Sequence, residues 1–82
     1  MDRKTILMDY IKNDIMRNRN AKLSEDEDLL SSGILDSLGI LQLVAFMEKT
    51  FGIRIPDEDV MFDNFQSVRA MGDYLQKFSP GT

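Results

Sequence analysis

The residue best placed to take part in a reaction is Ser37. It lies between Asp36 and Leu38, where apolar residues begin to recur at helical spacing. A serine at the start of a helix is exposed. The first backbone amides of a helix lack acceptors within it, so this position lies at the positive end of the helix dipole. The alternative is that Ser37 only caps the helix. Because Asp36 could supply that cap instead, capping alone does not explain the serine.

No side chain in the sequence is suited to activate Ser37. The 82 residues include no histidine and no cysteine, which excludes a serine–histidine–acid triad, a thiolate metal site and a disulfide framework. The Gly-x-Ser-x-Gly elbow of serine hydrolases is also missing, because Leu35 occupies the first glycine position. We therefore expect that the chain is not an enzyme and depends on another protein for any reaction at Ser37.

The elements that must position Ser37 are predicted from apolar spacing. With 43% apolar residues, we expect one small core in a single domain over residues 1–82, with a frayed tail at 79–82. Leu7, Ile11 and Ile15 recur at helical intervals and predict a first helix, which ends at the turn-forming residues 17–20. A long polar loop follows over residues 21–36, and four leucines are expected to anchor it: Leu23, Leu29, Leu30 and Leu35.

The strongest helix is predicted from Ser37 to Phe51, with Asp36 or Ser37 as its cap and Gly52 ending it in a left-handed turn. One stripe of this helix should face the core, and its members are Ile40, Leu43, Val44, Met47 and Phe51. A second apolar stripe, which is rotated away from the first, consists of Leu38, Leu41 and Ala45.

The last part of the chain predicts two further helices. Residues 53–56 alternate like a strand, but Pro56 and the short length favour an extended linker. The acids at 57–59 are typical of the first turn of a short helix. Ser67 should cap a last helix whose apolar stripe is Val68, Met71, Leu75 and Phe78. The pattern predicts an all-α four-helix bundle, with three longer helices, a short third helix and a long loop between the first two.

Charge and hydropathy narrow the range of partners. Residues 1–23 hold six basic and three acidic residues, whereas residues 24–82 hold four basic and eleven acidic residues. The acidic body argues against nucleic acid and suits proteins with basic docking surfaces. The acidic run at 25–28 lacks the spacing of a calcium loop, so we expect no metal site. No apolar run is long enough for a signal peptide or a membrane span, so we expect a cytoplasmic protein with no membrane insertion. We also expect a monomer.

The stretch from Asp28 to Leu38, Asp-Leu-Leu-Ser-Ser-Gly-Ile-Leu-Asp-Ser-Leu, resembles the acyl carrier protein family, in which an Asp-Ser-Leu triplet opens the second helix. The triplet alone is a weak signal. The helix end at 51–53, the approach to the short helix at 55–57, and Ser67 also fit the family in the same order. The resemblance covers roughly residues 5–78.

This resemblance implies that Ser37 carries 4'-phosphopantetheine. The arm would come from coenzyme A through a phosphopantetheinyl transferase that recognises Asp36 and supplies the magnesium ion and the base. The thiol at the far end of the arm would hold acyl or aminoacyl groups as thioesters, so that a chain without cysteine can serve as an acyl carrier protein. The alternative is a helical protein-interaction module of the same fold whose serine is never modified.

Family members meet their partners beside the attachment serine, so we predict that Leu38, Leu41, Ala45 and Glu48 contact them. The alternative for Leu41 is that it only edges the core. The expected partners are the transferase, a ligase or synthase that loads the arm, and enzymes that process the cargo.

One departure from the family concerns the cargo. The carriers of fatty acid biosynthesis and lipid metabolism have a strongly acidic second helix, whereas this chain has Gly39, Gln42 and Lys49 where acids are usual. The approach at 33–36, Gly-Ile-Leu-Asp, is more similar to carriers of D-alanine, other amino acids or intermediates of secondary metabolism. We therefore expect a dedicated pathway, while the identity of the cargo stays open.

Overall fold

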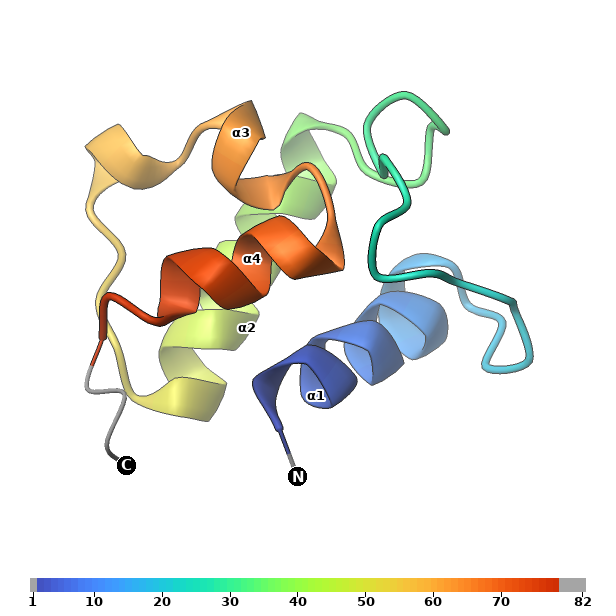
Figure 1. Ribbon diagram of the computed structural model, residues 1–82, viewed down its shortest axis with the longest axis horizontal. Helices are drawn as coiled ribbons and strands as arrows, with labels where there is room; N and C mark the ends of the chain where they lie inside the picture. Colours follow the sequence, from blue (N-terminus) through green and yellow to red (C-terminus); the bar gives the residue numbers. More distant parts are fainter. Residues whose placement is uncertain (1, 79–82) are drawn as a thin grey trace.

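The computed structural model describes residues 2–78 and is all-helical over that range, with no β-strand. In chain order the elements are α1 (Arg3–Tyr10), the π-helical turn η1 (Ile11–Ile15), α2 (Ser37–Phe51), the 3-10 turn η2 (Asp57–Asp59), α3 (Phe62–Phe65) and α4 (Val68–Leu75). The expected all-α fold, with a long loop between the first two helices, is confirmed (Figure 1). The tail predicted to fray at 79–82 lies outside the described residues.

The first helix lies where its apolar spacing predicted it, but its end differs from a regular α-helix. Its start is capped by Asp2, whose carboxylate accepts a hydrogen bond from the Thr5 amide at 2.9 Å. The last turn widens into η1, where the Met16 amide donates to the Ile11 carbonyl at 2.7 Å. Arg17 then reverses the chain with a φ of 56°.

α2 has the bounds that the sequence predicted. The Asp36 carboxylate accepts a hydrogen bond from the Gly39 amide at 2.8 Å, and Gly52 ends the helix with a φ of 65°. Ile40, Leu43 and Met47 are buried, as expected for the core stripe. The other two predicted members of that stripe, Val44 and Phe51, are half-buried and pack against the core.

The short third helix does not begin at residue 57 as expected. Residues 57–59 form only the turn η2, the chain then extends through Met61, and α3 starts at Phe62. The reason is a local hydrogen bond, since the Asn64 side-chain amide donates to the Asp59 carbonyl at 2.8 Å and holds the turn apart from α3. Residues 53–56 form no strand and connect α2 to η2, as predicted.

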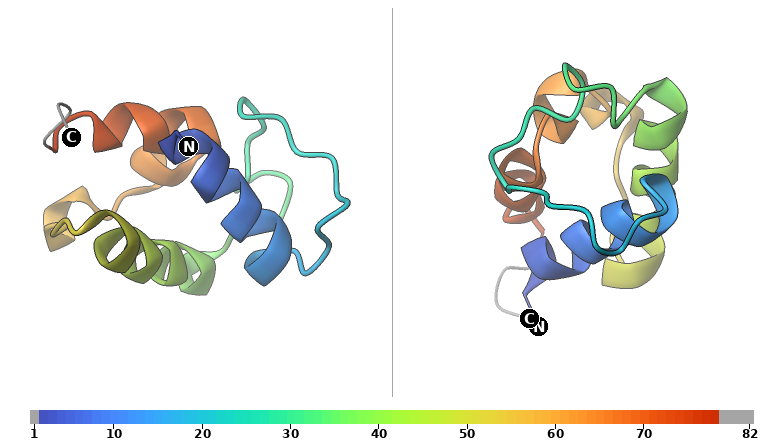
Figure 2. Two further views of the ribbon diagram at one scale, coloured as in Figure 1. Left: turned by 90° about the horizontal axis from the view of Figure 1, so that it is seen from below. Right: turned by 90° about the vertical axis from the view of Figure 1, so that its right-hand side faces the viewer.

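α4 forms as expected and completes the bundle. Ser67 caps it by accepting from the Ala70 amide at 3.0 Å. Val68, Met71 and Leu75 are fully buried, while Phe78 lies beyond the helix and is half-buried. α4 packs against both α1 and α3. Figure 2 shows α2 and α4 on opposite sides of the bundle, with α1 running diagonally between them.

The long loop is fixed to the helices rather than only covering them. Leu29 and Leu35 are buried in the core, and Leu23 and Leu30 are half-buried against it, so all four predicted anchors pack inward. Backbone hydrogen bonds join the loop to the end of α3 and the start of α4, from the Leu29 amide to the Gln66 carbonyl at 2.8 Å and from the Arg69 amide to the Glu25 carbonyl at 2.9 Å. These contacts fix the approach to Ser37.

Candidate functional site

Ser37 is the first residue of α2, and its side chain is exposed. The sequence left open whether Asp36 or Ser37 caps the helix. The structure assigns the cap to Asp36, whose Oδ1 accepts the Gly39 amide. The Ser37 hydroxyl is therefore not needed to complete the helix. It stands at the end of the helix that favours negative charge, where the first amides lack acceptors within the helix.

The segment before Ser37 is held by its own hydrogen bonds. Asp28 accepts from the amides of Leu30 and Ser31 at 3.1 and 3.0 Å, and from the Gln66 side chain at 3.0 Å. The Ser31 amide and the Gln66 side chain hold the pKa of Asp28 below its ordinary value. Gly33 turns the chain with a φ of 81°, a conformation that favours glycine. The approach is therefore a defined turn that presents Ser37 in one orientation.

Gly39 explains part of the departure from an acidic second helix. A Cβ added at Gly39 would lie 2.9 Å from Leu35 Cδ2 and 3.4 Å from Asp36 Oδ1. An acidic side chain there would press on the core anchor and lie beside the capping carboxylate. Glycine at this position is consistent with the tight packing of Leu35 under the helix start.

The predicted partner stripe faces solvent. Leu38 and Leu41 are 65% and 58% exposed, and Ala45 is exposed as well, whereas Leu43 is fully buried. This confirms the helical phase, and Leu41 does not edge the core. Glu48 has a further contact that the sequence did not indicate, because its Oε2 accepts a hydrogen bond from the Ile55 amide at 2.9 Å. It thereby joins the end of α2 to the linker.

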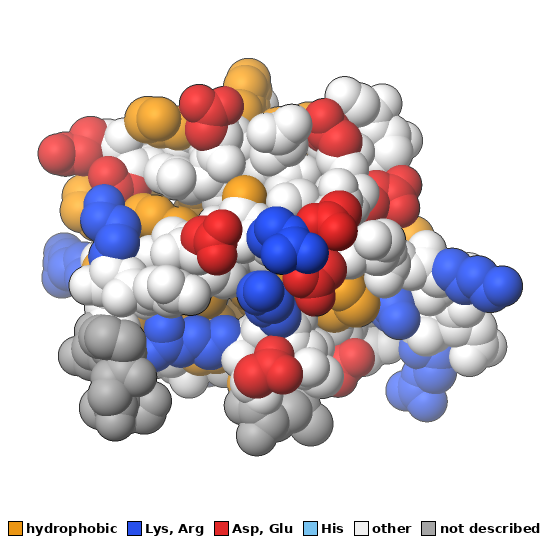
Figure 3. All heavy atoms as spheres, in the orientation of Figure 1, with side chains coloured by type: hydrophobic (Ala, Val, Ile, Leu, Met, Phe, Trp, Pro, Cys, Tyr) orange, Lys and Arg blue, Asp and Glu red, His pale blue; other side chains and the backbone are white. Residues whose placement is uncertain are grey.

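Two exposed apolar residues were missed in the sequence, Met61 and Phe62, which are 48% and 62% exposed. Together with Leu38 and Leu41 they are the large exposed hydrophobic residues of the described chain. Figure 1 shows α3 beside the N-terminal half of α2, and Figure 3 shows apolar side chains along the upper edge over this region. Phe65, three residues later, is buried. The sequence carried no signal that separated it from Met61 and Phe62, because the helix was expected to start at residue 57.

The position of Met61 and Phe62 depends on contacts of η2 with α4. The Tyr74 hydroxyl donates to Asp59 Oδ2 at 2.7 Å, and the Lys77 ammonium lies 3.7 Å from the same oxygen. Burial and the Asp59 carboxylate both raise the pKa of Tyr74, which keeps the phenol protonated as the donor. These contacts hold the segment that presents the two apolar side chains.

Residues 7–75 match the family model described as the phosphopantetheine attachment site. The chain belongs to the phosphopantetheine-binding carrier family. Proteins of this family are carriers, not enzymes, and hold a covalently bound 4'-phosphopantetheine. The carrier fits that group at Ser37, because the hydroxyl is exposed, is not required as a cap and stands at the positive end of α2.

Two further comparisons relate the carrier to individual proteins. It is 42% identical over 43 residues to D-alanyl carrier proteins of Streptococcus pyogenes, among them those of serotype M5 (strain Manfredo) and serotype M1. The match covers 52% of this chain and 54% of each relative, so the carrier spans about half the length of the curated relatives it matches. A solved structure described as "Crystal structure of FAD-dependent dehydrogenase" contains a similar chain, with a TM-score of 0.72 and 28% identity over 84% of this chain and 97% of that chain.

Within residues 2–78, no helix has the length and apolar character needed to cross a bilayer. The acids in that range form no cluster suited to a metal ion.

Proposed function

We propose that the carrier holds its arm on Ser37 and that the arm bears a small amino acid, with D-alanine as the first candidate. The observation that supports the attachment site is the division of roles at the start of α2, where Asp36 caps the helix and leaves Ser37 exposed. In the transfer from coenzyme A, the Ser37 oxygen bonds to the phosphorus of the arm's phosphate. The bond from that phosphorus to the nucleotide breaks, and the hydroxyl proton passes to the transferase.

Asp36 has a second oxygen for the transferase to recognise. Oδ1 accepts the Gly39 amide, whereas no hydrogen bond within residues 2–78 engages Oδ2, and the side chain is exposed. We therefore keep Asp36 as a recognition residue for the phosphopantetheinyl transferase, as the family resemblance implies. The arm, once attached, supplies the thiol on which the cargo is held.

Support for an amino acid as cargo comes from the D-alanyl carrier proteins that the chain matches and from the surface of α2. The buried Gly39 leaves no room for an acid at the start of the helix. A ligase that loads an amino acid is the partner that this proposal requires. A role in fatty acid biosynthesis or secondary metabolism, the cytoplasmic location and the monomeric state stay predictions from the sequence.

A second candidate is supported by the chain in the structure described as an FAD-dependent dehydrogenase, which matches most of this carrier. In that case the arm would present its thioester to a flavin enzyme for oxidation. The two candidates are compatible, because a loaded amino acid can be the substrate of a later oxidation.

The partner surface that we propose combines the stripe on α2 with the two residues missed in the sequence. Leu38, Leu41, Ala45 and Glu48 lie on α2. Met61 directly precedes α3 and Phe62 is its first residue, and we include both in this surface because α3 lies beside the N-terminal half of α2 (Figure 1). Exposed apolar side chains gathered near one reactive residue are typical of protein-binding sites, in which a few anchors supply most of the affinity.

The test of the site is intact mass. Incubation of the apo protein with coenzyme A, magnesium and a broad-specificity phosphopantetheinyl transferase should add one arm, and Ser37→Ala should abolish the addition with an unchanged melting temperature. The matched control is Ser67→Ala, which removes a serine that caps α4; it should lower stability by about 1 kcal/mol and still accept the arm. Addition of an arm to Ser37→Ala would refute the site, and an unmodified wild type would favour the interaction module.

The test of the cargo uses the protein purified from its own host with the thioester intact. The mass added beyond the arm should correspond to one alanine residue, and hydrolysis should release the D enantiomer. Release of a fatty acid would refute the amino acid proposal while leaving the attachment site intact. A mass two hydrogens lower than the loaded amino acid would support the oxidation candidate.

A further inference from the structure

The turn between η1 and the long loop concentrates positive charge. Residues 17–22 include Arg17, Arg19 and Lys22 and no acid, and all three cations are exposed. We call these six residues the basic turn. It contrasts with the rest of the chain after residue 23, in which acids outnumber bases by eleven to four. The partner surface near Ser37 and α3 does not include it.

The basic turn has a defined backbone. The Asn18 amide donates to the Lys12 carbonyl at 2.8 Å, and the Ala21 amide donates to the Asn18 carbonyl at 2.9 Å. The Asn18 side chain accepts from the Asn20 amide at 3.1 Å. Arg17 adopts the left-handed conformation with a φ of 56°, which costs energy for a residue that is not glycine and is often retained at functional positions. The turn therefore presents its cations on a fixed frame.

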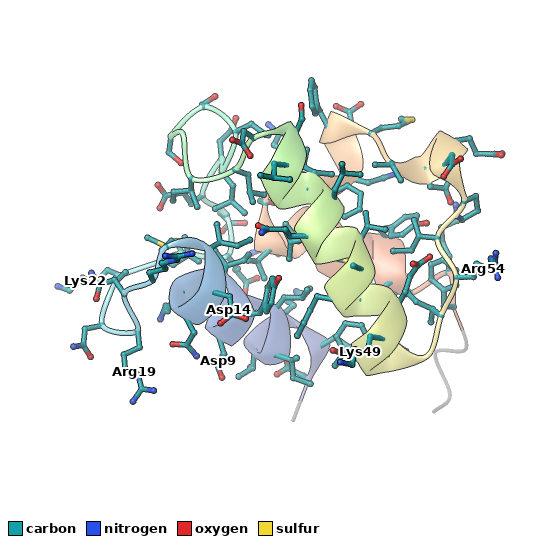
Figure 4. The ribbon with its side chains drawn as sticks, turned by 180° about the vertical axis from the view of Figure 1, so that it is seen from behind. Asp9, Asp14, Arg19, Lys22, Lys49 and Arg54 are labelled. Carbon is teal, nitrogen blue, oxygen red and sulfur yellow. The ribbon has the colours of Figure 1, made fainter. Side chains whose placement is uncertain are left out.

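Nearby acids do not neutralise the basic turn. Glu25 is engaged by Lys4 at 3.5 Å and by Arg69 at 3.1 Å, and Asp26 pairs with Arg69 as well. No ion pair within residues 2–78 includes Arg17, Arg19 or Lys22. Figure 4 shows Arg19 and Lys22 directed into solvent at one end of the molecule, away from Asp9 and Asp14. Their charge is available to a second molecule.

The same view relates the basic turn to the partner surface. Figure 4 shows α2 along the front of the molecule and the basic turn at the edge of that face. A protein seated on the exposed side of α2 would thus reach Arg19 and Lys22. Contact at one apolar surface alone leaves the carrier free to rotate about it, and a distant charged contact would fix the direction in which Ser37 points.

We propose that the basic turn is a second docking point, which binds an acidic surface patch of the enzyme that loads the arm. This inference rests on the proposed carrier role of Ser37. Charge complementarity supports a protein as occupant, since separate positive and negative ends can align a carrier on a partner with the opposite arrangement. An anionic membrane fits less well. The rest of the chain after residue 23 holds eleven acidic and four basic residues, which an anionic surface would repel.

The chain offers a matched pair of variants for the test. Arg19→Gln with Lys22→Gln removes one arginine and one lysine from the basic turn. Lys49→Gln with Arg54→Gln removes the same two residue types at the other end of the face shown in Figure 4, and both of those side chains are exposed. All four side chains are on the surface, so both variants should have the melting temperature of the wild type.

The experiment measures the steady-state rate at which cargo is loaded onto the arm-bearing carrier. The enzyme is the host ligase that attaches whichever cargo is found on the native protein. At low salt, the variant in the basic turn should raise the KM for the carrier about threefold to tenfold, with an unchanged kcat. The control variant should keep the wild-type KM. Raising the salt from about 50 to about 500 mM should remove the difference, because screening shortens the reach of surface charges.

Three results would overturn the inference. Equal KM values for the wild type and the variant in the basic turn would exclude the contact. Equal increases in both variants would show a general charge effect. Sedimentation of the wild type, but not of the variant in the basic turn, with phosphatidylglycerol vesicles would indicate an anionic lipid surface instead. Failure of the D-alanine proposal would appear in the mass of the cargo and would not alter this comparison, and failure of the attachment site would appear as an arm on Ser37→Ala.

Discussion

α2 and the segment from η2 to α3 both contribute to the partner surface, but they are stabilised in different ways. α2 has 15 residues, a side-chain cap at its start and a left-handed glycine at its end, so its bounds are determined by its own sequence. α3 has four residues and no side-chain cap. Its place depends on contacts with α4 and with the long loop. The exposed residues on α2 are therefore positioned locally, and Met61 and Phe62 are positioned by tertiary contacts.

The largest effect in this comparison should come from the two leucines of α2 that differ in burial. Leu43→Ala should lower the free energy of unfolding by about 2–5 kcal/mol, because it removes a fully buried side chain and leaves a cavity. Leu41→Ala should leave stability nearly unchanged and slow the loading of the arm. Melting temperature and the rate of thioester formation measure the two effects. A stability loss of similar size in both variants would show that Leu41 supports the core.

An intermediate effect should come from the contact that holds the segment before α3. Tyr74→Phe removes the hydrogen bond to Asp59 and should cost about 0.5–1.5 kcal/mol. Amide hydrogen exchange should rise across residues 59–65 more than across α2, because α2 does not depend on this contact. The matched control is Tyr10→Phe. The Tyr10 ring stacks on Phe46, and its hydroxyl makes no hydrogen bond within the described residues. If amide exchange rose equally across α2 and residues 59–65 in both variants, the contact between Tyr74 and Asp59 would not be what positions α3.

The same difference explains what the sequence predicted and what it did not. The bounds of α2 and the cap of α4 were predictable because a polar side chain at one position and apolar residues at helical spacing act over a few residues. The division of η2 from α3 depends on Asn64 and on Tyr74, which reaches Asp59 from 15 residues away in the sequence. The turn η1 was hidden for another reason, since Leu7, Ile11 and Ile15 fit an α-helix and a widened last turn equally well.

The residues of the candidate site also differ in whether the sequence could predict them. Ser37 and Asp36 were predicted because the attachment motif is contiguous, and Leu38 and Leu41 followed from the helical phase of α2. Met61 and Phe62 were missed because a helix started at residue 57 would have given these side chains a different phase. The contact of Glu48 with the Ile55 amide could not be predicted either, because it depends on the path that the linker takes after Gly52.

The smallest effect should appear at the approach to Ser37, where Asp28 joins the loop to Gln66. The Ser31 amide and the Gln66 side chain hold the pKa of Asp28 below its ordinary value, so the folded state favours the carboxylate. A lowered folded pKa adds stability above the unfolded value, and that stability is lost as the pH falls through the folded pKa. Asp28→Asn should therefore melt slightly earlier than the wild type at neutral pH. The difference should shrink as the pH falls below the ordinary pKa of a free aspartate and through the lower pKa of folded Asp28. Melting curves of both proteins across that range measure it, and a difference that grows toward acid would show that Asp28 stabilises the approach in its protonated form.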